Sequence, residues 1–339
     1  MSNLKDKLLK LTREPRKYLS FIFECGLLNN MDDESYIKLL WLIRMGYPID
    51  LNHPKTFNEK LQWLKLHDRN PLYNIMADKY EAKQFVAERV GDEYVVPCYG
   101  VWDHFDDIDF DKLPNEFVLK TTHDYAGVVI VDDRDVFDQK AARNLLEKHL
   151  KKNHFYNTRE WVYKDIKPRI IAEKLLKNSN SSELLDYKIT CFDGVPTFTY
   201  IRSRDTNDNL LLTFNDGNPP FKYNPDFNLS DIKLEYRIRK ALKDIEFITF
   251  YDNDFNIIPC SNDEGPSLVS PFPKPANFDK MLEIAAKLSQ NIPHVRVDFY
   301  EVDGKLYVGE LTFYTSAGFA NFSPDKYNRI FGDMIKLPE

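Results

Sequence analysis

The sequence predicts an α+β fold, with helices first and antiparallel hairpins later in the chain. Apolar residues recur at helical spacing over residues 1–50. Two later stretches, 186–204 and 294–313, read as pairs of strands joined at Asp-Gly turns. Residues 205–275 between them are rich in Asn, Asp and Pro and show little periodicity. Because strands and helices do not alternate regularly, a doubly wound parallel sheet is not expected.

The composition is that of a folded protein with an ordinary surface. Of the 339 residues, 43% are hydrophobic and 14% aromatic, which suffices for sizeable cores. The formal charge is −7, from 46 Lys and Arg against 53 Asp and Glu, which argues against a general nucleic-acid binder. The four cysteines form no Cys-x-x-Cys pair, so zinc fingers are not expected and a reducing cytoplasm fits.

The N-terminal segment is basic and amphipathic. Leu4, Leu8 and Leu11 recur at helical spacing among lysines and arginines, without the apolar core of a cleaved signal. We expect this helix to pack on the protein in the cytoplasm. A helix that contacts the inner face of a membrane is the alternative.

Helices are predicted from their capping residues and apolar spacing. Thr56 and Glu59 form a capping box, which starts a helix over 57–68. Further helices are predicted over residues 70–90, 138–152 and 278–290.

Strands are predicted by apolar runs bounded by turn residues. Besides the two Asp-Gly hairpins, they are a short strand over 94–102 with a proline exit, a strand–turn–strand unit over 117–131 and a buried strand over 169–176.

The C-terminal hairpin carries the sharpest cluster of charged side chains. Arg296 and Asp298 are two residues apart, so they share one face of a strand. A turn at Asp303-Gly304 brings Asp298 roughly opposite residues 309–310, and so near Glu310. Two carboxylates on rigid strands suit Mg²⁺, which completes its octahedron with phosphate oxygens and water. Charged residues on a half-exposed sheet would give the same pattern.

Two other strands end in charged residues. Lys120 precedes the turn THDYAG, where a lysine facing a small-residue loop can hold a phosphate chain. Glu173, in the strand IIAEKLL, can lie near the amino group of an adenine. Taken alone, an ordinary charged strand end is the simpler explanation of either residue, and the Walker A and GxGxxG motifs are absent.

In order and spacing, these elements resemble the ATP-grasp superfamily, in which two α+β lobes grip ATP between two sheets. Over about residues 35–337 the chain is similar to the teichuronopeptide-biosynthesis type of ATP-grasp protein. Such proteins occur in surface-polysaccharide clusters and are labelled amidoligases or sometimes glycosyltransferases. The similarity rests on PKTFNEKLQWLKL, DRNPLY, ADKYEAK, FVLKTTHDYAGVVI, KPRIIAEKLL, DYKITCFDG, VRVDFY and GELTFY.

The resemblance implies a role for each of these charged residues. Lys79 and Lys120 match the two phosphate lysines, and Arg296 matches an arginine that steadies the acyl phosphate. The residues that match the adenine linker are Glu173, Lys174 and Leu176, and those that match the magnesium carboxylates are Asp298 and Glu310. Lys120 and Arg296 are therefore the expected catalytic residues, with ATP and Mg²⁺ as cofactors.

The chain departs from the superfamily pattern at its second metal position. Many ATP-grasp ligases have Glu-x-Asn there, whereas this chain has Glu310-Leu311-Thr312. Thr312 offers a neutral oxygen that is a weaker ligand, which leaves open whether one or two Mg²⁺ bind. The superfamily usually has a Pro-Gly pair shortly after this position, and in this chain Thr315-Ser316 takes its place.

The loop that covers the phosphates also departs from the pattern. THDYAGV contains one glycine, Gly127, where the superfamily often has several. Two interpretations stay open: His123 and Asp124 compensate for the missing glycines, or the loop is less mobile.

Substrate contacts are predicted on the strands that follow. Arg202 and Arg204 lie two apart and are candidates to clamp a carboxylate, unless they lie on a solvated edge. Lys188 is expected to reach the γ-phosphate or the ribose. The segment 205–275 is long for a structureless loop, which suggests a substrate-facing insertion.

The expected architecture is an ATP-grasp body behind a helical N-terminal extension, residues 1–70. A pre-grasp segment (71–115) precedes the small lobe (116–175) and the large lobe (176–339), which carries the insertion at about 205–275.

The expected activity is an ATP-dependent carboxylate–amine ligase that joins an amino compound to a uronic-acid sugar in capsule or cell-wall polysaccharide. Its expected partners are a sugar, sugar-nucleotide or polysaccharide carboxylate and an amine, without nucleic acid. A glycosyltransferase and a non-catalytic nucleotide-binding scaffold are the alternatives. The glycosyltransferase alternative lacks a clear sugar-nucleotide DxD motif. Asp252-Asn253-Asp254 matches that pattern of residues, but we expect it in a loop and not at a metal site.

Overall fold

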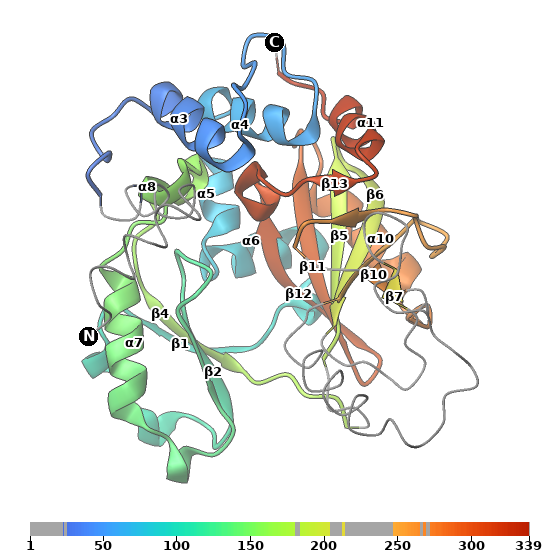
Figure 1. Cartoon of the computed structure of the whole chain (residues 1–339). Helices are drawn as coiled ribbons and strands as arrows, with labels where there is room; N and C mark the ends of the chain where they lie inside the picture. Colours follow the sequence, from blue (N-terminus) through green and yellow to red (C-terminus); the bar gives the residue numbers. More distant parts are fainter. Residues whose placement is uncertain are drawn as a thin grey trace, which may run out of the picture.

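The computed structural model describes residues 23, 26–179, 184–203, 212–213, 247–264, 267–268 and 272–338 (Figure 1). Two antiparallel sheets stand side by side, with helices across one end. The α+β class predicted from the sequence is confirmed. The N-terminal helix and most of the 205–275 insertion lie outside the described residues.

Helices at the start of the chain form a layer across one end of the large sheet (Figure 1). They are α3 (Asp33–Met45) and α4 (Phe57–His67), and the C-terminal α11 (Lys326–Met334) packs on α4. Helices α5 (Leu72–Ala77) and α6 (Glu81–Val90) follow beside the edge strand β12 (Lys305–Thr312). The predicted capping box starts α4: the Thr56 hydroxyl accepts from the Glu59 N–H at 3.3 Å, and the Glu59 carboxylate accepts from the Thr56 N–H at 2.9 Å.

Residues 70–90, predicted to be one helix, form α5 and α6 with a break at Asp78. Asp78 is extended, and its carboxylate accepts from the N–H groups of Tyr80 at 2.8 Å and Glu81 at 3.2 Å. An aspartate that satisfies these free N–H groups starts a new helix. The break places Lys79 in a loop, where its side chain can leave the helical layer.

A four-stranded sheet forms the smaller lobe. Its strands are β1 (Cys98–Trp102), β2 (Phe117–Thr121), β3 (Val128–Val131) and β4 (Ile170–Lys174), in the order β1-β4-β2-β3. Helix α7 (Gln139–Leu150) covers one face and buries Phe117, Leu119 and Ala172 (Figure 1). Lys120 and Glu173 alternate with these residues and so belong to the opposite face.

Strand β1 differs from its prediction in two ways. It begins at Cys98, directly after Pro97, whereas the predicted strand began at residue 94. Proline lacks an N–H and is tolerated at the entry to a strand. The strand also pairs with β4, so the small sheet includes part of the segment 71–115 that was expected to precede the lobe.

A five-stranded sheet forms the larger lobe, with α10 (Phe278–Leu288) packed on β5, β6 and β11. Its strands, in the order β12-β11-β5-β6-β8, are β5 (Asp186–Phe192), β6 (Val195–Ser203), β8 (Phe247–Tyr251), β11 (Val295–Val302) and β12 (Lys305–Thr312). Both hairpins predicted at Asp-Gly turns are confirmed, because β5 pairs with β6 and β11 with β12.

Strand β8 corrects the expectation that residues 205–275 are irregular throughout. Ile248, Thr249, Phe250 and Tyr251 are all buried, so FITFY is a continuous apolar run without a polar face. A strand covered on both sides lacks the alternation by which strands are usually recognised.

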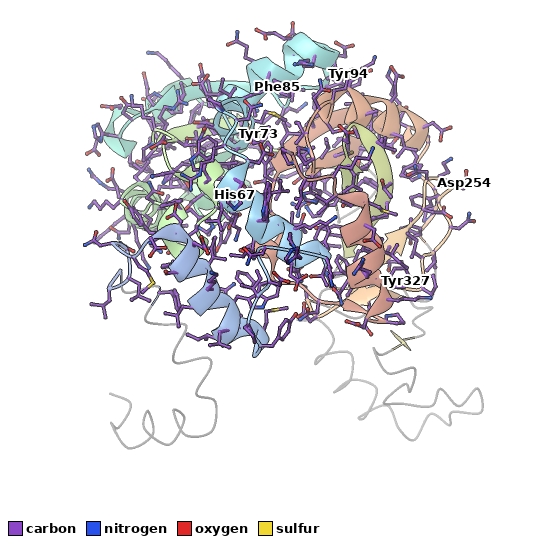
Figure 2. The ribbon with its side chains drawn as sticks, turned by 90° about the horizontal axis from the view of Figure 1, so that it is seen from above. His67, Tyr73, Phe85, Tyr94, Asp254 and Tyr327 are labelled. Carbon is purple, nitrogen blue, oxygen red and sulfur yellow. The ribbon has the colours of Figure 1, made fainter. Side chains whose placement is uncertain are left out.

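Short elements complete the described fold. They are α8 (Phe155–Thr158), the strand pairs β7 (Leu212–Thr213) with β10 (Ser267–Leu268) and β9 (Ser261–Asn262) with β13 (Phe322–Ser323), and 3₁₀ turns at Asp92–Tyr94, Phe105–Asp107, Phe110–Lys112, Arg134–Val136, Trp161–Tyr163 and Thr315–Gly318. The main core lies between the large sheet and the helices, where Tyr73 occupies the interior (Figure 2).

Candidate active site

Asp298 and Glu310 face each other across the hairpin of β11 and β12. They are direct partners in the strand register, as the position of the turn predicts. The register shifts immediately afterwards, at Gly309. A Cβ atom at residue 309 would lie 2.6 Å from Cε2 of Tyr300, so this bulge requires glycine. The bulge therefore fixes Glu310 beside Asp298 and admits the Tyr300 ring.

Two cations surround the buried carboxylate of Asp298. Arg296 donates to it through Nε at 2.6 Å and Nη2 at 2.7 Å, and Lys188 donates through Nζ at 2.6 Å. Burial alone raises the pKa of Asp298, but Arg296 and Lys188 outweigh this effect and hold the pKa below its ordinary value. The carboxylate is therefore ionised, although it is only 2% exposed.

Arg296 is itself held by neighbours on both sides. Its Nη1 donates to the hydroxyl of Tyr200 at 2.8 Å and its Nη2 to that of Thr312 at 3.0 Å. Burial opposes the charge of Arg296, but Asp298 outweighs burial and raises the pKa further above its usual value. The guanidinium is consequently a fixed positive charge.

Asp186 joins this cluster, although sequence reasoning did not select it. Its carboxylate accepts a hydrogen bond from Lys188, while its Oδ1 is buried without a partner. Burial and the negative charge of Asp298 raise the pKa of Asp186. The signal in the sequence was the two-residue spacing in Asp186-Tyr187-Lys188, which puts both charges on one face of β5.

Lys79 connects the two lobes. Its Nζ donates to the main-chain oxygen of Asp124 and lies 3.9 Å from Oε1 of Glu310. Its N–H donates to the oxygen of Thr122 at 3.0 Å. The first predicted phosphate lysine thus lies between the turn of the small lobe and the carboxylates of the large lobe.

Glu173 is paired with two lysines on the inner face of the small sheet. Its carboxylate lies 2.6 Å from Nζ of Lys120 and 2.5 Å from Nζ of Lys83. Burial raises the pKa of Glu173, but Lys120 and Lys83 outweigh it and lower the pKa below its ordinary value. Sequence reasoning missed Lys83. Its spacing of four from Lys79, at the start of a helix, is the signal that could have found it.

Lys174 and Leu176, the other two residues predicted for the adenine linker, leave the small sheet toward β5. The N–H of Lys174 donates to the oxygen of Pro97 at 2.9 Å, while its side chain is exposed. Leu176 follows two residues later and is half-buried.

The donor atoms at the hairpin fit Mg²⁺ only together with phosphate. A carboxylate offers about four lone-pair positions, and the bonds from Arg296 and Lys188 leave about one of those on Asp298. Glu310 is half-buried, and Thr312 adds a hydroxyl that already accepts from Arg296. The part of the chain that the structure describes contains no cluster of three or more metal-ligating residues. Such sparse oxygen ligands suit a magnesium ion that takes its remaining ligands from ATP and water.

Of the two arginines predicted to clamp a carboxylate, the structure describes only Arg202. Arg202 forms an ion pair with Glu264, and Arg204 lies outside the described residues. Arg202 nevertheless lines the cavity beside the hairpin of β11 and β12.

This cavity has a volume of about 1240 Å³ and reaches Arg296, Glu310 and Thr312. Aromatic and cationic side chains contribute much of its remaining lining: Tyr125, Tyr156, Tyr163, Tyr314, Arg44, Lys151 and Lys152. Tyr125 and Tyr156 are 65% and 37% exposed.

The Asp252-Asn253-Asp254 sequence is a turn at the surface. Asp252 accepts from the N–H groups of Asp254 at 3.0 Å and Asn256 at 2.8 Å, so its carboxylate is already hydrogen-bonded within the turn. Asp254 lies at the edge of the molecule in Figure 2 and does not line the cavity. This motif therefore offers no support for a sugar-nucleotide metal site.

The family model described as TupA-like ATPgrasp matches residues 59–219 and 244–336 of the chain. The chain belongs to the TupA-like ATP-grasp family. The resemblance noted in the sequence and the ATP-grasp fold are thereby confirmed. No curated protein sequence matches the chain.

Solved structures with a similar fold include several ligases. VanG D-Ala:D-Ser ligase from Enterococcus faecalis is 11% identical, over 77% of this chain and 60% of that chain, with a TM-score of 0.40. D-alanine–D-alanine ligase from Bacillus anthracis is 17% identical, over 77% and 66%, with a TM-score of 0.37. L-amino acid ligase from Bacillus licheniformis is 12% identical, over 85% and 57%, with a TM-score of 0.40. The chain thus spans less than two thirds of the length of each of these three proteins.

Within the described ranges, each helix is too short or too polar to cross a membrane.

Proposed function

We propose that this TupA-like protein is an ATP-dependent ligase that joins a carboxylate to an amine. The observation that carries the proposal is the hairpin pair Asp298 and Glu310, which lies between Arg296 and Lys79, a residue of the loop between α5 and α6. This arrangement combines oxygen ligands for a metal–nucleotide complex with fixed cations on both sides. It opens into a cavity large enough for a second substrate.

In the proposed reaction, a substrate carboxylate oxygen attacks the γ-phosphorus of ATP, and the bond to the β–γ bridging oxygen breaks to release ADP. An amine then attacks the acyl carbon of the resulting acyl phosphate, phosphate leaves, and the amine loses a proton to give the amide. Mg²⁺, when bound, supplies charge neutralisation at the phosphate oxygens.

The residues of the chain contribute position and charge. Lys79 and Lys188 have ammonium groups beside Glu310 and Asp298, so both are suited to hold phosphate oxygens at the reaction centre. Lys120 and Glu173 are suited to the part of the nucleotide that the small lobe covers, with Lys174 and Leu176 on the adenine side. Arg296, a fixed cation that lines the cavity, is suited to stabilise the acyl phosphate and its developing oxyanion.

We propose a uronic-acid sugar of a surface polysaccharide as the carboxylate substrate, and a cytoplasmic reaction. A cavity of about 1240 Å³ exceeds the ~300–1,000 Å³ typical of small-molecule sites, which favours a substrate larger than an amino acid. Exposed tyrosine rings suit the apolar faces of a sugar, and the lysines of the lining suit its acidic groups. We also propose the division into a small lobe at 116–175, to whose sheet β1 adds a strand, and a large lobe at 176–339, with an N-terminal extension over 1–70.

A non-catalytic nucleotide-binding scaffold is a second candidate, favoured by Thr312 and by the Thr315-Ser316 sequence in place of the usual residues. The test incubates the protein with Mg-ATP, uronic-acid donors and a panel of amines, and measures ADP. ADP that depends on both a carboxylate and an amine supports the ligase. ATP binding without turnover supports the scaffold, and UDP released from a UDP-sugar without ATP supports glycosyl transfer.

A further inference from the structure

The turn between β2 and β3 is organised around the side chain of Asp124. One of its carboxylate oxygens, Oδ1, accepts from the hydroxyl of Thr121 and from the N–H of Gly127, the latter at 3.1 Å. The other oxygen, Oδ2, accepts from Nδ1 of His149 on α7. Asp124 is only 6% exposed, so an acidic side chain is buried at the centre of a turn that faces the ATP site.

The same residue holds the first phosphate lysine. Lys79 donates its Nζ to the main-chain oxygen of Asp124, and its own N–H to the oxygen of Thr122 at 3.0 Å. Because Lys79 also lies 3.9 Å from Glu310, a displacement of the turn would change where its ammonium group sits relative to the carboxylates. Asp124 therefore connects α7, the turn and the active-site hairpin.

Neighbouring residues restrict the turn further. His123 is buried, and its Nε2 lies 3.2 Å from the oxygen of His149 and 3.0 Å from that of Lys152, which are hydrogen-bond acceptors at the end of α7. Gly127 folds directly over Thr121, and a Cβ atom at residue 127 would collide with the Thr121 hydroxyl. This turn is thus held by contacts on each side, with one glycine where the chain passes closest to itself.

The pKa of Asp124 agrees with this geometry. Burial raises it, but the hydrogen bonds from Thr121, His149 and Gly127 together outweigh burial and lower the pKa below its ordinary value. The carboxylate is therefore an acceptor for these donors at neutral pH.

We propose that Asp124 is a positioning residue that presets the phosphate-covering turn and Lys79 before ATP binds. This inference rests on the proposed ATP-dependent function. A flexible loop loses conformational entropy when it closes over phosphate, whereas a turn already held by a buried carboxylate does not lose it again. Asp124 itself touches no reacting atom and acts through Lys79 and the turn.

The kinetic test compares Asp124→Ala with Asp124→Asn and with the matched control Asp135→Asn, an exposed aspartate of the same lobe. We expect Asp124→Ala to raise the KM for ATP by about 10-fold to 100-fold, with a smaller change in kcat. Asparagine keeps an oxygen for Thr121 and Gly127, so we expect Asp124→Asn to fall between alanine and wild type. Asp135→Asn should match wild type.

A purely structural role would reduce the fraction of active protein, which lowers kcat and leaves KM for ATP unchanged. That result for Asp124→Asn, the variant that preserves side-chain shape, would overturn the inference even if Asp124→Ala failed to fold.

Hydrogen exchange without ATP separates this inference from the proposed function. We expect the amides of residues 122–128 to exchange at least about 10-fold faster in Asp124→Asn than in wild type, since the Gly127 N–H loses a charged acceptor. Amides in the middle of α7 should keep their protection. If the turn amides exchange equally fast in Asp124→Asn and in wild type, the inference is wrong. If the wild-type protein forms no ADP, only the proposed function is contradicted.

Discussion

The candidate site is built in two different ways in its two lobes. In the large lobe, Arg296, Asp298 and Glu310 are placed by the ladder of one β-hairpin, where pairing and alternation fix each side chain. In the small lobe, the turn over residues 122–127 is placed by side-chain bonds to Asp124 from Thr121 and from His149 on α7. A strand ladder repeats along its whole length, whereas the turn depends on a few individual bonds. Single substitutions therefore have different consequences in the two lobes.

The loop after β12 shows that side-chain anchoring also occurs in the large lobe. Lys65 of α4 is buried and donates to the oxygens of Thr158 at 2.9 Å and Ala317 at 2.8 Å. Gln62, also on α4, donates to the oxygens of Ala317 at 3.1 Å and Gly318 at 2.8 Å. Both residues 316 and 317 have positive φ, so these bonds hold a loop conformation that L-residues rarely adopt.

The largest effect is expected from removing the charge at the centre of the ladder. Asp298→Asn should lower the rate of ADP formation by at least about 10²–10³-fold, since it deletes a proposed magnesium ligand and leaves Arg296 and Lys188 without their shared counter-charge. Circular dichroism should show that the fold persists. Glu301→Gln on the same strand is the control and should retain activity. If Asp298→Asn forms ADP at the wild-type rate, Asp298 is not a magnesium ligand.

A smaller loss is expected from disturbing the ladder without touching a charge. In Gly309→Ala the new methyl group meets the Tyr300 ring at 2.6 Å, so the bulge must shift and carry Glu310 with it. A displacement of about 1 Å at a reacting centre can cost ~10²-fold, and we expect a loss of that order in kcat/KM.

Gly304→Asn, in the turn of the same hairpin, provides the comparison. Gly304 has a φ of 78°, a Cβ atom at this position would meet nothing within 4 Å, and asparagine tolerates the conformation. If both variants have the same kcat/KM, the bulge does not position Glu310.

The smallest effect concerns stability and pH. Burial lowers the pKa of Lys65 to about 7, against ~10.4 in an unfolded chain. Between these values the unfolded state binds one proton more, so stability rises with pH; below pH 7 both states are protonated and the contribution is constant. From pH 7 to 8.5 the increase is about 2 kcal/mol at ~1.36 kcal/mol per pH unit.

Urea unfolding at these two pH values measures this increase in wild type and in Lys65→Met, which should lack it. Lys38→Met, at an exposed helix position, should keep the wild-type difference. An unchanged pH dependence in Lys65→Met would show that Lys65 keeps its proton in the native state throughout this range.

The comparison between the lobes also explains which parts of the site were predictable. The pairing of Asp298 with Glu310 follows from a turn and a two-residue period, both of which are local properties of the chain. Lys83, Asp186 and the role of Asp124 depend on partners far away in sequence: Asp124 contacts His149, and Lys188 contacts Asp298, 110 residues away. Residue spacing can mark Lys83 and Asp186 as candidates, but it does not reveal which distant residues they contact.

The sequence by itself determined the α+β class, the capping box at Thr56, the two Asp-Gly hairpins and the family to which the chain belongs. Each of these is encoded by residues a few positions apart. Only the tertiary structure decided the pairing of β8 with β6 and the bonds that hold Lys79 beside both lobes. Those features depend on which buried donors and acceptors meet after the chain has folded, because a buried polar group must find its partner wherever the fold supplies one.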